Sequence, residues 1–444
     1  MRPLENPKAP SYRRAAPPLR IFLRGWLLHR EFLSGVLALF LCALDLRAMA
    51  GTVWKPLGPS GGNCLFSIAK PADPSQITVV TADPCGVYRS SNGGTAWSRI
   101  GAIPSATIND VCASSFADLY ALTYSGCYRS SDGGANWSYA SFPASSGWAY
   151  LVCAHPTDPN LVFAAGYTYD YGSGSYSLAF FKSTNKGQTW AASSFFSFPY
   201  CFPYGFAVSK SDPTVMYVCG IKQTGSAYVG ALFRSTNGGL EWADISSAVD
   251  SREWYYFYCV AIDPTDANRV YVGGDNFYTS ANGGTTWANS SSPPYVYAIG
   301  IDPTNTSNLY AAGYYTVYVS KNKGVSWNGR TGINGDPVHV EIPAVSPSTV
   351  LISTSLGLFK STNGGENWAA SDEGIYACRI PALAAAPSCP TTLFIEKQGC
   401  NVLDSHDSGN TWTDLPAFLI CGNICALVVH RQNPDIVLAL EGGG

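Results

Sequence analysis

The sequence predicts an all-β protein built from a repeated structural unit, and two observations carry this prediction. First, an eight-residue pattern, S-x-[D/N]-x-G-x-x-W, occurs eight times, and successive copies start 40 to 53 residues apart. Second, the 444 residues include 44 glycines, 27 tyrosines and 12 tryptophans, which suits many short strands joined by tight turns. The eight copies begin at Ser90, Ser130, Ser183, Ser235, Ser280, Ser320, Ser361 and Ser405.

Each copy has the features of a β-hairpin turn. The Asn or Asp at its third position can hydrogen-bond the backbone just ahead, and glycine adopts positive φ at low steric cost. A short run that alternates apolar and polar residues precedes the turn, as Gly357–Lys360 precedes Ser361. Such alternation is typical of a half-buried strand. The closing tryptophan, here Trp368, then begins the returning strand.

The pattern and its spacing resemble the Asp-box, or BNR, repeat proteins, which include sialidases, xyloglucan-cleaving endoglucanases, sortilin-type domains and photosystem II assembly factors. The resemblance extends over residues 51–444 and implies a single β-propeller of eight or nine four-stranded blades. Aspartate occupies the third position only at Asp132 and Asp407, and asparagine, which makes the same turn, replaces it elsewhere. Two alternatives stay open at the C-terminus: the last strands close the ring with Thr52–Leu57, or the sequence is truncated.

Residues 1–50 have the layout of a secretory signal peptide with a long basic leader. Several arginines precede the apolar run Phe32–Leu44, and Ala48-Met49-Ala50 supplies a small-x-small cleavage site. The alternative is an uncleaved membrane anchor, but the apolar run is shorter than the roughly 20 residues that a span needs. We therefore expect a secreted or periplasmic protein without a stable membrane span after cleavage.

Composition also bears on partners and cofactors. Only 13% of the residues are charged and the net charge is −3, so no basic field would attract nucleic acid. The five histidines are scattered and no opposed Cys-x-x-Cys pairs occur, so we expect no metal and no other cofactor. The 14 cysteines suit an oxidising compartment, where Cys112 with Cys127, or Cys389 with Cys400, could bridge neighbouring strands. We expect a monomer.

The resemblance implies that ligands bind on the face opposite the repeated turns. The loops expected on that face are rich in aromatic side chains, which suit stacking on sugar rings or holding peptide side chains. The alternative is that these rings pack between blades, and we expect this of about half of them. The candidate ligand-binding residues are Trp148, Tyr169, Tyr171, Arg252, Trp254, Tyr256, Tyr297, Tyr315, Arg330 and Arg379.

Carboxylates on the same loops are the candidate catalytic residues, namely Asp170, Asp250 and Glu253. A glycosidase needs two carboxyl groups about 5 to 10 Å apart across the sugar. We favour Asp250 and Glu253, because a carboxyl group beside the indole of Trp254 can have its pKa raised into the range of a general acid. The alternative for each of the three is a solvated loop charge.

A sialidase would need three arginines on the substrate carboxylate. Arg252, Arg330 and Arg379 are the candidates, and Cys378-Arg379-Ile380-Pro381 resembles the F-R-I-P motif of that family. The interpretation that we favour is a recognition module that binds a glycan or an extracellular protein. The alternatives are a glycoside hydrolase of the sialidase or xyloglucanase type and an assembly or adhesion scaffold, so whether the chain is an enzyme stays open.

Overall fold

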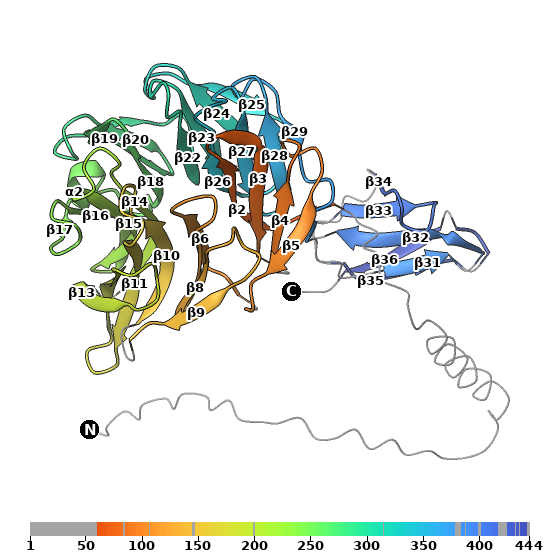
Figure 1. Ribbon diagram of the computed structural model, residues 1–444, viewed down its shortest axis with the longest axis horizontal. Coiled ribbons are helices and arrows are strands. Elements are labelled where there is room, and N and C mark those ends of the chain that lie inside the picture. The colour runs from red at the N-terminus through yellow and green to blue at the C-terminus, as the bar shows by residue number, and fades with distance from the viewer. Residues whose placement is uncertain are drawn as a thin grey trace, which may run out of the picture. The chain divides into compact units, whose positions relative to one another are not determined.

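The computed structural model describes residues 60–441 except for 83–84, 106, 144–146, 199, 314, 378–382, 387, 398–400, 416–423, 431 and 435. The expected signal peptide and Thr52–Leu57 therefore lie outside the described residues. In the described part, the regular elements are β-strands apart from one short helix, α2 (Ser246–Val249) (Figure 1). None of the described residues belongs to a helix that is long and apolar enough to cross a membrane.

The described strands form eight four-stranded antiparallel sheets, each with its strands in sequence order. We call the first seven blades 1 to 7. Blade 1 contains β2 (Cys64–Lys70), β3 (Asp73–Thr81), β4 (Gly86–Ser90) and β5 (Ser98–Ala102). Blade 2 contains β6 (Asp110–Ala113), β7 (Leu119–Thr123), β8 (Gly126–Ser130) and β9 (Ser138–Ser141). Blade 3 contains β10 (Trp148–Ala154), β11 (Val162–Asp170), β12 (Ser175–Ser183) and β13 (Ala191–Phe198). Blade 4 contains β14 (Cys201–Val208), β15 (Met216–Thr224), β16 (Ala227–Ser235) and β17 (Ala243–Asp244).

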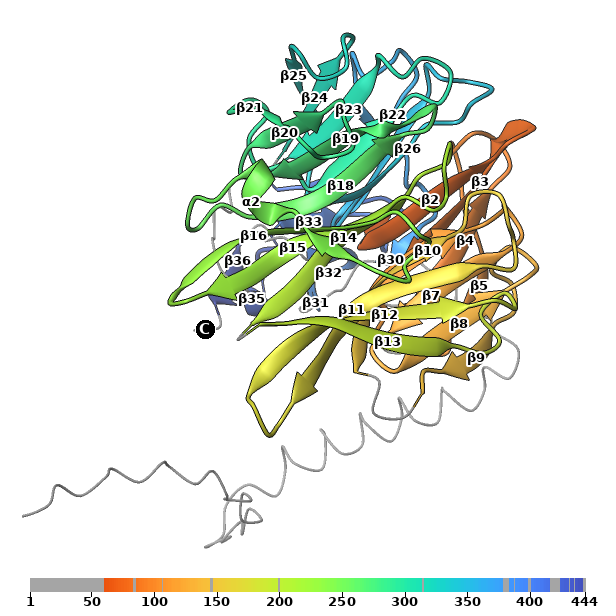
Figure 2. The same ribbon diagram turned by 90° about the vertical axis from the view of Figure 1, so that its left-hand side faces the viewer.

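The other three blades have the same order. Blade 5 contains β18 (Phe257–Asp263), β19 (Asp266–Gly274), β20 (Phe277–Ser280) and β21 (Ala288–Ser290). Blade 6 contains β22 (Ala298–Ile301), β23 (Leu309–Gly313), β24 (Thr316–Ser320) and β25 (Asn328–Thr331). Blade 7 contains β26 (Pro337–Glu341), β27 (Val350–Thr354), β28 (Gly357–Ser361) and β29 (Ala369–Ala370). The first strand of every blade packs against the first strand of the next, which is the arrangement of a β-propeller (Figure 2).

The ring closes between blade 7 and blade 1. Strand β2 packs against β26 and β27, and Ser353 Oγ donates a hydrogen bond to Ser67 Oγ at 3.2 Å. Lys360 Nζ of blade 7 donates to the carbonyl oxygen of Gly93 in blade 1. In addition, β1 (Gly61–Gly62) pairs in parallel with β30 (Tyr376–Ala377). The all-β propeller and the eight four-stranded sheets agree with the prediction, but closure occurs after seven of them.

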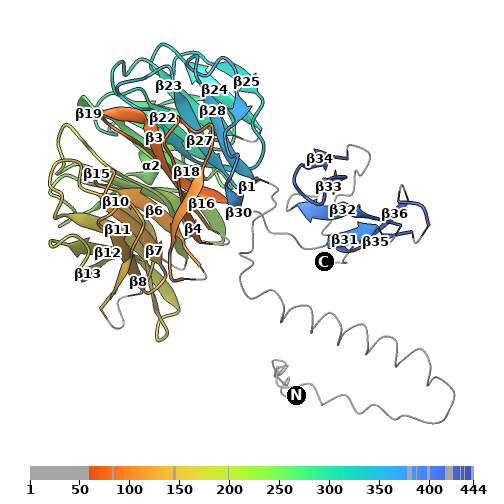
Figure 3. The same ribbon diagram turned by 45° about the vertical axis from the view of Figure 1, so that its right-hand side comes forward.

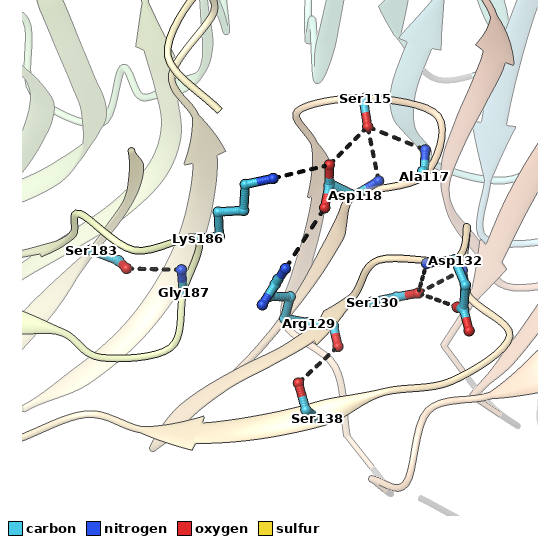
Figure 4. A network of polar contacts seen from close by, with 11 residues as sticks. Ser115, Ala117, Asp118, Arg129, Ser130, Asp132, Ser138, Ser183, Lys186 and Gly187 are labelled. Atoms are coloured by element: carbon cyan, nitrogen blue, oxygen red, sulfur yellow. Dashed lines mark hydrogen bonds and ion pairs between the residues drawn. The ribbon is translucent and has the colours of Figure 1, made fainter. Parts of the chain in front are cut away.

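The repeated pattern forms the same hairpin turn in all eight copies, between the third and fourth strands of a sheet. In blade 2, Ser130 Oγ donates to Asp132 Oδ1 and accepts from the N–H of Gly134, both at 2.8 Å (Figure 4). The remaining copies repeat both bonds with Asn or Asp. Gly134 has a φ of 98°, and a Cβ there would lie 2.6 Å from Val87 of blade 1. The turn therefore requires glycine for its backbone and for contact with the preceding blade.

The apolar core lies between neighbouring blades. One cluster combines Tyr120 and Cys127 of blade 2 with Ala149 and Phe181 of blade 3, all of them at most 1% exposed. Another combines residues of blade 1 with Leu351 of blade 7, which makes the closure an ordinary blade-to-blade contact. Each sheet therefore buries both faces against its neighbours, as propeller blades do.

The eighth four-stranded sheet is described here by itself. It contains β31 (Leu383–Ala386), β32 (Cys389–Lys397), β33 (Asn401–Ser405) and β34 (Thr413–Asp414). A two-stranded sheet of β35 (Ile424–Val429) and β36 (Val437–Glu441) packs against it, with β35 beside β31 and β32 (Figure 3). Their shared core includes Phe394 of β32 and Leu427 of β35.

Candidate functional site

An inner row of aromatic rings crosses blades 3 to 6 near the start of their first strands. Tyr150 lies on β10, Phe202 and Tyr204 on β14, Tyr258 on β18, and Tyr297 directly before β22. The ring centroids of Tyr150 and Phe202 are 4.3 Å apart, and those of Phe202 and Tyr204 are 5.5 Å apart. Tyr204 lies 6.2 Å from Tyr258, which stacks on Tyr297 at 4.9 Å. The rings thus form a continuous line across four blades.

An outer row runs beside the inner row over the long hairpins of blades 3 and 4. Tyr167 and Tyr176 are 5.1 Å apart, Tyr176 and Tyr200 are 5.2 Å apart, and Tyr200 and Tyr228 are 5.4 Å apart. The row ends at Trp254, whose ring lies 5.8 Å from that of Tyr228.

The two rows meet where Tyr150 stacks on Tyr167, with 3.1 Å between their hydroxyl oxygens. We call the ten rings of both rows the aromatic ribbon.

Strand geometry explains why the rings of the blade 3 hairpin gather on one side. Strands β11 and β12 have nine residues each, and side chains two positions apart face the same way. Tyr167 and Tyr169 therefore share a face, and Tyr176 stands opposite Tyr169 in the register. Trp148 packs against Tyr167 at 5.6 Å, and Tyr171 packs against Tyr169 at 4.9 Å. Tyr169 and Tyr171 extend the ribbon toward the tip of the hairpin, and Trp148 flanks the ribbon beside Tyr167.

Several rings are open to solvent. Trp148 is 37% exposed, Tyr171 83% and Trp254 59%. Tyr295 and Tyr315 of the neighbouring blade 6 are 50% and 59% exposed. Trp254, Tyr295 and Tyr315 also have positive φ angles of 65°, 50° and 51°. In the described part of the chain, the other non-glycine residues with positive φ lie in the repeated turns.

The carboxylate of Asp170 caps the tip of the blade 3 hairpin. It accepts hydrogen bonds from the N–H of Gly172 at 2.9 Å and from Ser173 Oγ at 2.7 Å. The hydrogen bond from Ser173, followed by that from Gly172, lowers the pKa of Asp170. The group is therefore a turn-stabilising anion rather than a proton donor.

The prediction of a raised pKa at Asp250 is wrong. Its carboxylate accepts hydrogen bonds from Nε and Nη2 of Arg252. It also accepts one from the hydroxyl of Tyr278 at 2.7 Å. Burial raises the pKa of Asp250, but the bonds from Arg252 and Tyr278 outweigh this effect and the pKa is lowered. The indole of Trp254 turns instead to Tyr228, and Glu253 lies exposed beside it. Asp250 therefore forms a salt bridge with Arg252 and lacks the raised pKa that we expected of a general acid.

Of the three candidate arginines, the two that the structure describes, Arg252 and Arg330, are paired with different carboxylates on different elements. The guanidinium of Arg252 is engaged by Asp250 and lies 3.8 Å from the ring centroid of Tyr255. Arg330 lies on β25, where its Nη2 contacts Glu366 Oε2 in the repeated turn of blade 7 at 2.6 Å. Arg330 is thus held on a turn rather than among the aromatic loops. Arg379 lies outside the described residues.

Sequence reasoning missed Asp275, which contacts the ribbon, and Asp110 on the first strand of blade 2. Asp275 accepts the N–H of Tyr256 at 2.6 Å and the hydroxyl of Tyr258, a residue of the ribbon, at 3.3 Å. Asp110 on β6 and Glu341 on β26 are partly exposed but surrounded by protein, and burial raises the pKa of each to about 7. Their signal in the sequence was a carboxylate within a short apolar strand. No described group of three His, Cys, Asp or Glu side chains could hold a metal ion.

Two further features lie away from the ribbon. A hollow of about 530 Å³ at the junction of blades 7 and 1 is lined by Lys360, Asp372 and Glu373 among others, and by none of the predicted ligand-binding residues. Cys112 and Cys127 lie on β6 and β8, with β7 between them, and both are free thiols, so the disulfide that the sequence left open between them does not form. Cys400 lies outside the described residues.

Comparison with known proteins agrees with this fold. A model of the family described as "DUF6242 beta propeller domain" matches residues 80–274, which is less than half of the chain. No curated protein matches. Together with the seven-bladed ring, the family match defines the chain as a β-propeller protein.

Solved structures show the same likeness. A GH74 enzyme from Niastella koreensis is 14% identical over 86% of this chain and 70% of its own, with a TM-score of 0.58. An ancestral GH74 enzyme is 17% identical over 89% of this chain and 60% of its own, with a TM-score of 0.64. YCF48 from Cyanidioschyzon merolae is 15% identical over 70% of this chain and 99% of its own, with a TM-score of 0.51. At these identities the likeness concerns the fold alone.

Proposed function

We propose that this chain is an Asp-box β-propeller that binds an extended glycan on its aromatic ribbon. The observation that carries the proposal is the continuity of the ring contacts across blades 3 to 6, from Tyr150 to Tyr297. Flat aromatic faces stack on sugar rings, and tyrosine hydroxyls can bond the sugar hydroxyls. A row of such rings suits a chain of several sugars better than a single small molecule.

The backbone at the exposed rings supports the proposal. Trp254, Tyr295 and Tyr315 have positive φ, which costs of order 1 to 3 kcal/mol for a non-glycine residue. Strain of this kind persists where the surrounding structure imposes it, and it is concentrated at ligand-binding and active sites. At Trp254 the N–H donates to the carbonyl oxygen of Tyr228 at 2.8 Å, which fixes the loop against the ribbon.

The charges near the ribbon favour recognition over hydrolysis and a neutral glycan over an acidic one. Arg252 is paired with Asp250, and Lys222 is paired with Asp244. Asp170 and Asp250 have lowered pKa values, so neither has the proton that a general acid supplies at neutral pH. We further propose that the chain acts as a secreted or periplasmic monomer.

The test compares retention of the purified chain on immobilised neutral β-glucans and xyloglucan, with release of reducing ends measured in parallel. The variant is Trp254→Gly, which removes an exposed ring and relieves a positive φ, so it should fold normally. We expect it to weaken retention by about fivefold, since one stacked ring contributes on the order of 1 kcal/mol.

The matched control is Tyr139→Ala, because Tyr139 is 46% exposed on β9 and packs against Tyr128 outside the ribbon. It should bind as the wild type does. Unchanged retention of Trp254→Gly, or no retention of the wild type on any glycan, would reject glycan binding at the ribbon. Release of reducing ends would favour the glycoside hydrolase alternative, and capture of an extracellular protein through Trp254 without glycan binding would favour the protein-recognition alternative.

A further inference from the structure

A second repeated turn joins the first and second strands of several blades and holds an anion. Its sequence is Asp-Pro-Ser or Asp-Pro-Thr. In blade 1, Asp73 is the first residue of β3, and its Oδ1 accepts hydrogen bonds from the N–H and the hydroxyl of Ser75 at 3.2 and 2.6 Å. Asp212 of blade 4 makes the same two bonds with Thr214 at the same position of the turn. Asp263 and Asp302 make such bonds from a position three residues earlier in the turn. The pKa of Asp73 is lowered, chiefly by the bond from Ser75.

In the eighth sheet, a thiol occupies the position of this carboxylate. Cys389-Pro390-Thr391 replaces Asp-Pro-Thr at the start of β32. Cys389 Sγ lies 3.4 Å from the hydroxyl of Thr391 and accepts a hydrogen bond from the hydroxyl of Thr392 at 3.4 Å. The bonds from Thr391 and then from Thr392 lower the pKa of the Cys389 thiol. A turn that stabilises a carboxylate elsewhere therefore stabilises a thiolate here.

A histidine and an aspartate continue this polar chain. Thr392 Oγ1 lies 3.3 Å from His406 Nδ1, and His406 Nε2 lies 3.1 Å from Asp404 Oδ2. The strand register explains the arrangement, because Leu393 pairs with Ser405 and thus places Thr392 opposite His406. The order thiol, hydroxyl, imidazole, carboxylate is that of a nucleophile connected to a base that a third group orients.

The contacts accommodate two arrangements of protons. In one, the Cys389 thiol donates to Thr392, whose hydroxyl donates to neutral His406. In the other, Cys389 is a thiolate that accepts from Thr392, and His406 donates from Nδ1 to Thr392 and from Nε2 to Asp404. The two differ by one proton moved from sulfur to imidazole through the hydroxyl. In both arrangements Nε2 of His406 faces Asp404, which orients the imidazole ring.

We propose that Cys389 is a nucleophilic thiol that reacts with low-molecular-weight disulfides, with Thr392 and His406 as its proton relay. The thiolate sulfur attacks one sulfur of the disulfide, a new sulfur–sulfur bond forms, and the original one breaks. The displaced thiolate takes the proton from His406, so the products are a mixed disulfide on Cys389 and one free small thiol. No further oxidant is needed, because the disulfide itself is reduced.

Three other thiols in the described part of the chain lack these features. Burial raises the pKa of Cys153 to about 12, and it also raises the pKa values of Cys112 and Cys259. These thiols lie on apolar strands and should react slowly. The remaining ionisable group of β32 with a described side chain is Glu396, which is 2% exposed. Cys389 combines partial exposure with a stabilised thiolate.

The test treats the native chain with oxidised glutathione and quantifies the mixed disulfide at each cysteine by peptide mapping across pH 5 to 10. We expect Cys389 to react first, with its half-maximal rate below pH 8.5, the usual pKa of a cysteine thiol. Thr392→Val should move that midpoint upward by about one pH unit, since it removes the donor to sulfur. His406→Gln should slow the reaction at pH 7 by about tenfold or more.

A second variant keeps the proposal testable if the others disturb folding. Cys389→Asp restores the sequence of the other turns, so its thermal midpoint at pH 7 should equal or exceed that of the wild type. A midpoint several degrees lower would contradict an anion-stabilising turn. A Cys389 midpoint at or above the usual thiol value, or one that Thr392→Val leaves unchanged, would overturn the proposal.

Discussion

The indole Nε1 of Trp97 in blade 1 donates a 2.6 Å hydrogen bond to the carbonyl oxygen of Ser371, which follows the last strand of blade 7. The indole of Trp137 in blade 2 donates to Gly134 of its own turn at 3.0 Å instead. Trp97→Phe should lower the free energy of unfolding by about 1 to 2 kcal/mol, because a buried carbonyl at the ring closure loses its donor. Urea denaturation measures this, with Trp137→Phe as the control. An equal decrease in the free energy of unfolding in the two variants would mean that the bond at the ring closure contributes no more to stability than the bond within a turn.

Glu341 should make the stability of the ring depend on pH. Its Oε1 accepts the N–H of Ala69 across the closure at 3.2 Å, and burial raises its pKa from 4.5 to about 7. The folded state thus holds the proton more tightly than the unfolded state. Its contribution to stability is complete below pH 4.5 and is lost as the pH rises to about 7.

Glu341→Gln keeps the acceptor and removes the charge. Between pH 4.5 and 7, we expect the wild type to lose about 2 kcal/mol relative to this variant. Thermal unfolding across that range measures the difference. Asp336→Asn, a change at an exposed carboxylate of the neighbouring loop, should follow the wild type. Parallel curves for Glu341→Gln and the wild type would contradict the raised pKa.

The serine of the repeated turn should matter more than a surface serine nearby. Ser183 Oγ is buried and accepts a hydrogen bond from the N–H of Gly187 at 2.8 Å. Ser138 Oγ is exposed and donates to the carbonyl oxygen of Arg129 at 3.3 Å (Figure 4). Ser183→Ala leaves a buried N–H without its acceptor and should cost about 1 to 3 kcal/mol. Ser138→Ala should change stability by less than about 0.5 kcal/mol. Chemical denaturation of both variants decides the point.

Asp250 should be structural. Asp250→Asn weakens the bonds from Arg252 and Tyr278 and should destabilise the chain by about 1.5 to 3 kcal/mol at pH 7. Because its folded pKa is lowered, the wild-type contribution is present above pH 3.8 and is lost as the pH falls through the folded value. Asp170→Asn, at an exposed hairpin tip, should stay within about 0.5 kcal/mol of the wild type. A negligible effect of Asp250→Asn on thermal unfolding at pH 7 would show that the salt bridge contributes little.

The aromatic surface was partly predictable. Of the residues predicted to bind a ligand, Trp254 and Tyr297 belong to the aromatic ribbon. Trp148, Tyr169 and Tyr171 flank it. Their role in binding stays a prediction. The contacts that join them were not predictable, because Tyr150 and Phe202 belong to different blades and meet only in the ring. The expected pKa of Asp250 was wrong for a similar reason.

Whether the pKa of an acid rises or falls depends on its neighbours. Tyr278, which is 28 residues from Asp250, donates to it and helps to lower its pKa. Burial instead raises the pKa of Glu341, which lies on β26, the first strand of blade 7. Neither environment is visible in the local sequence.

The sequence by itself determined the repeating hairpin and the all-β sheets, because turn geometry depends on residues a few positions apart, such as Ser130, Asp132 and Gly134. Only the tertiary structure decided that the ring closes after seven blades, through Trp97 with Ser371 and Lys360 with Gly93. Every copy of the repeat is locally alike, so no copy marks which blade will meet the first. That choice is a matter of packing between residues more than 260 positions apart.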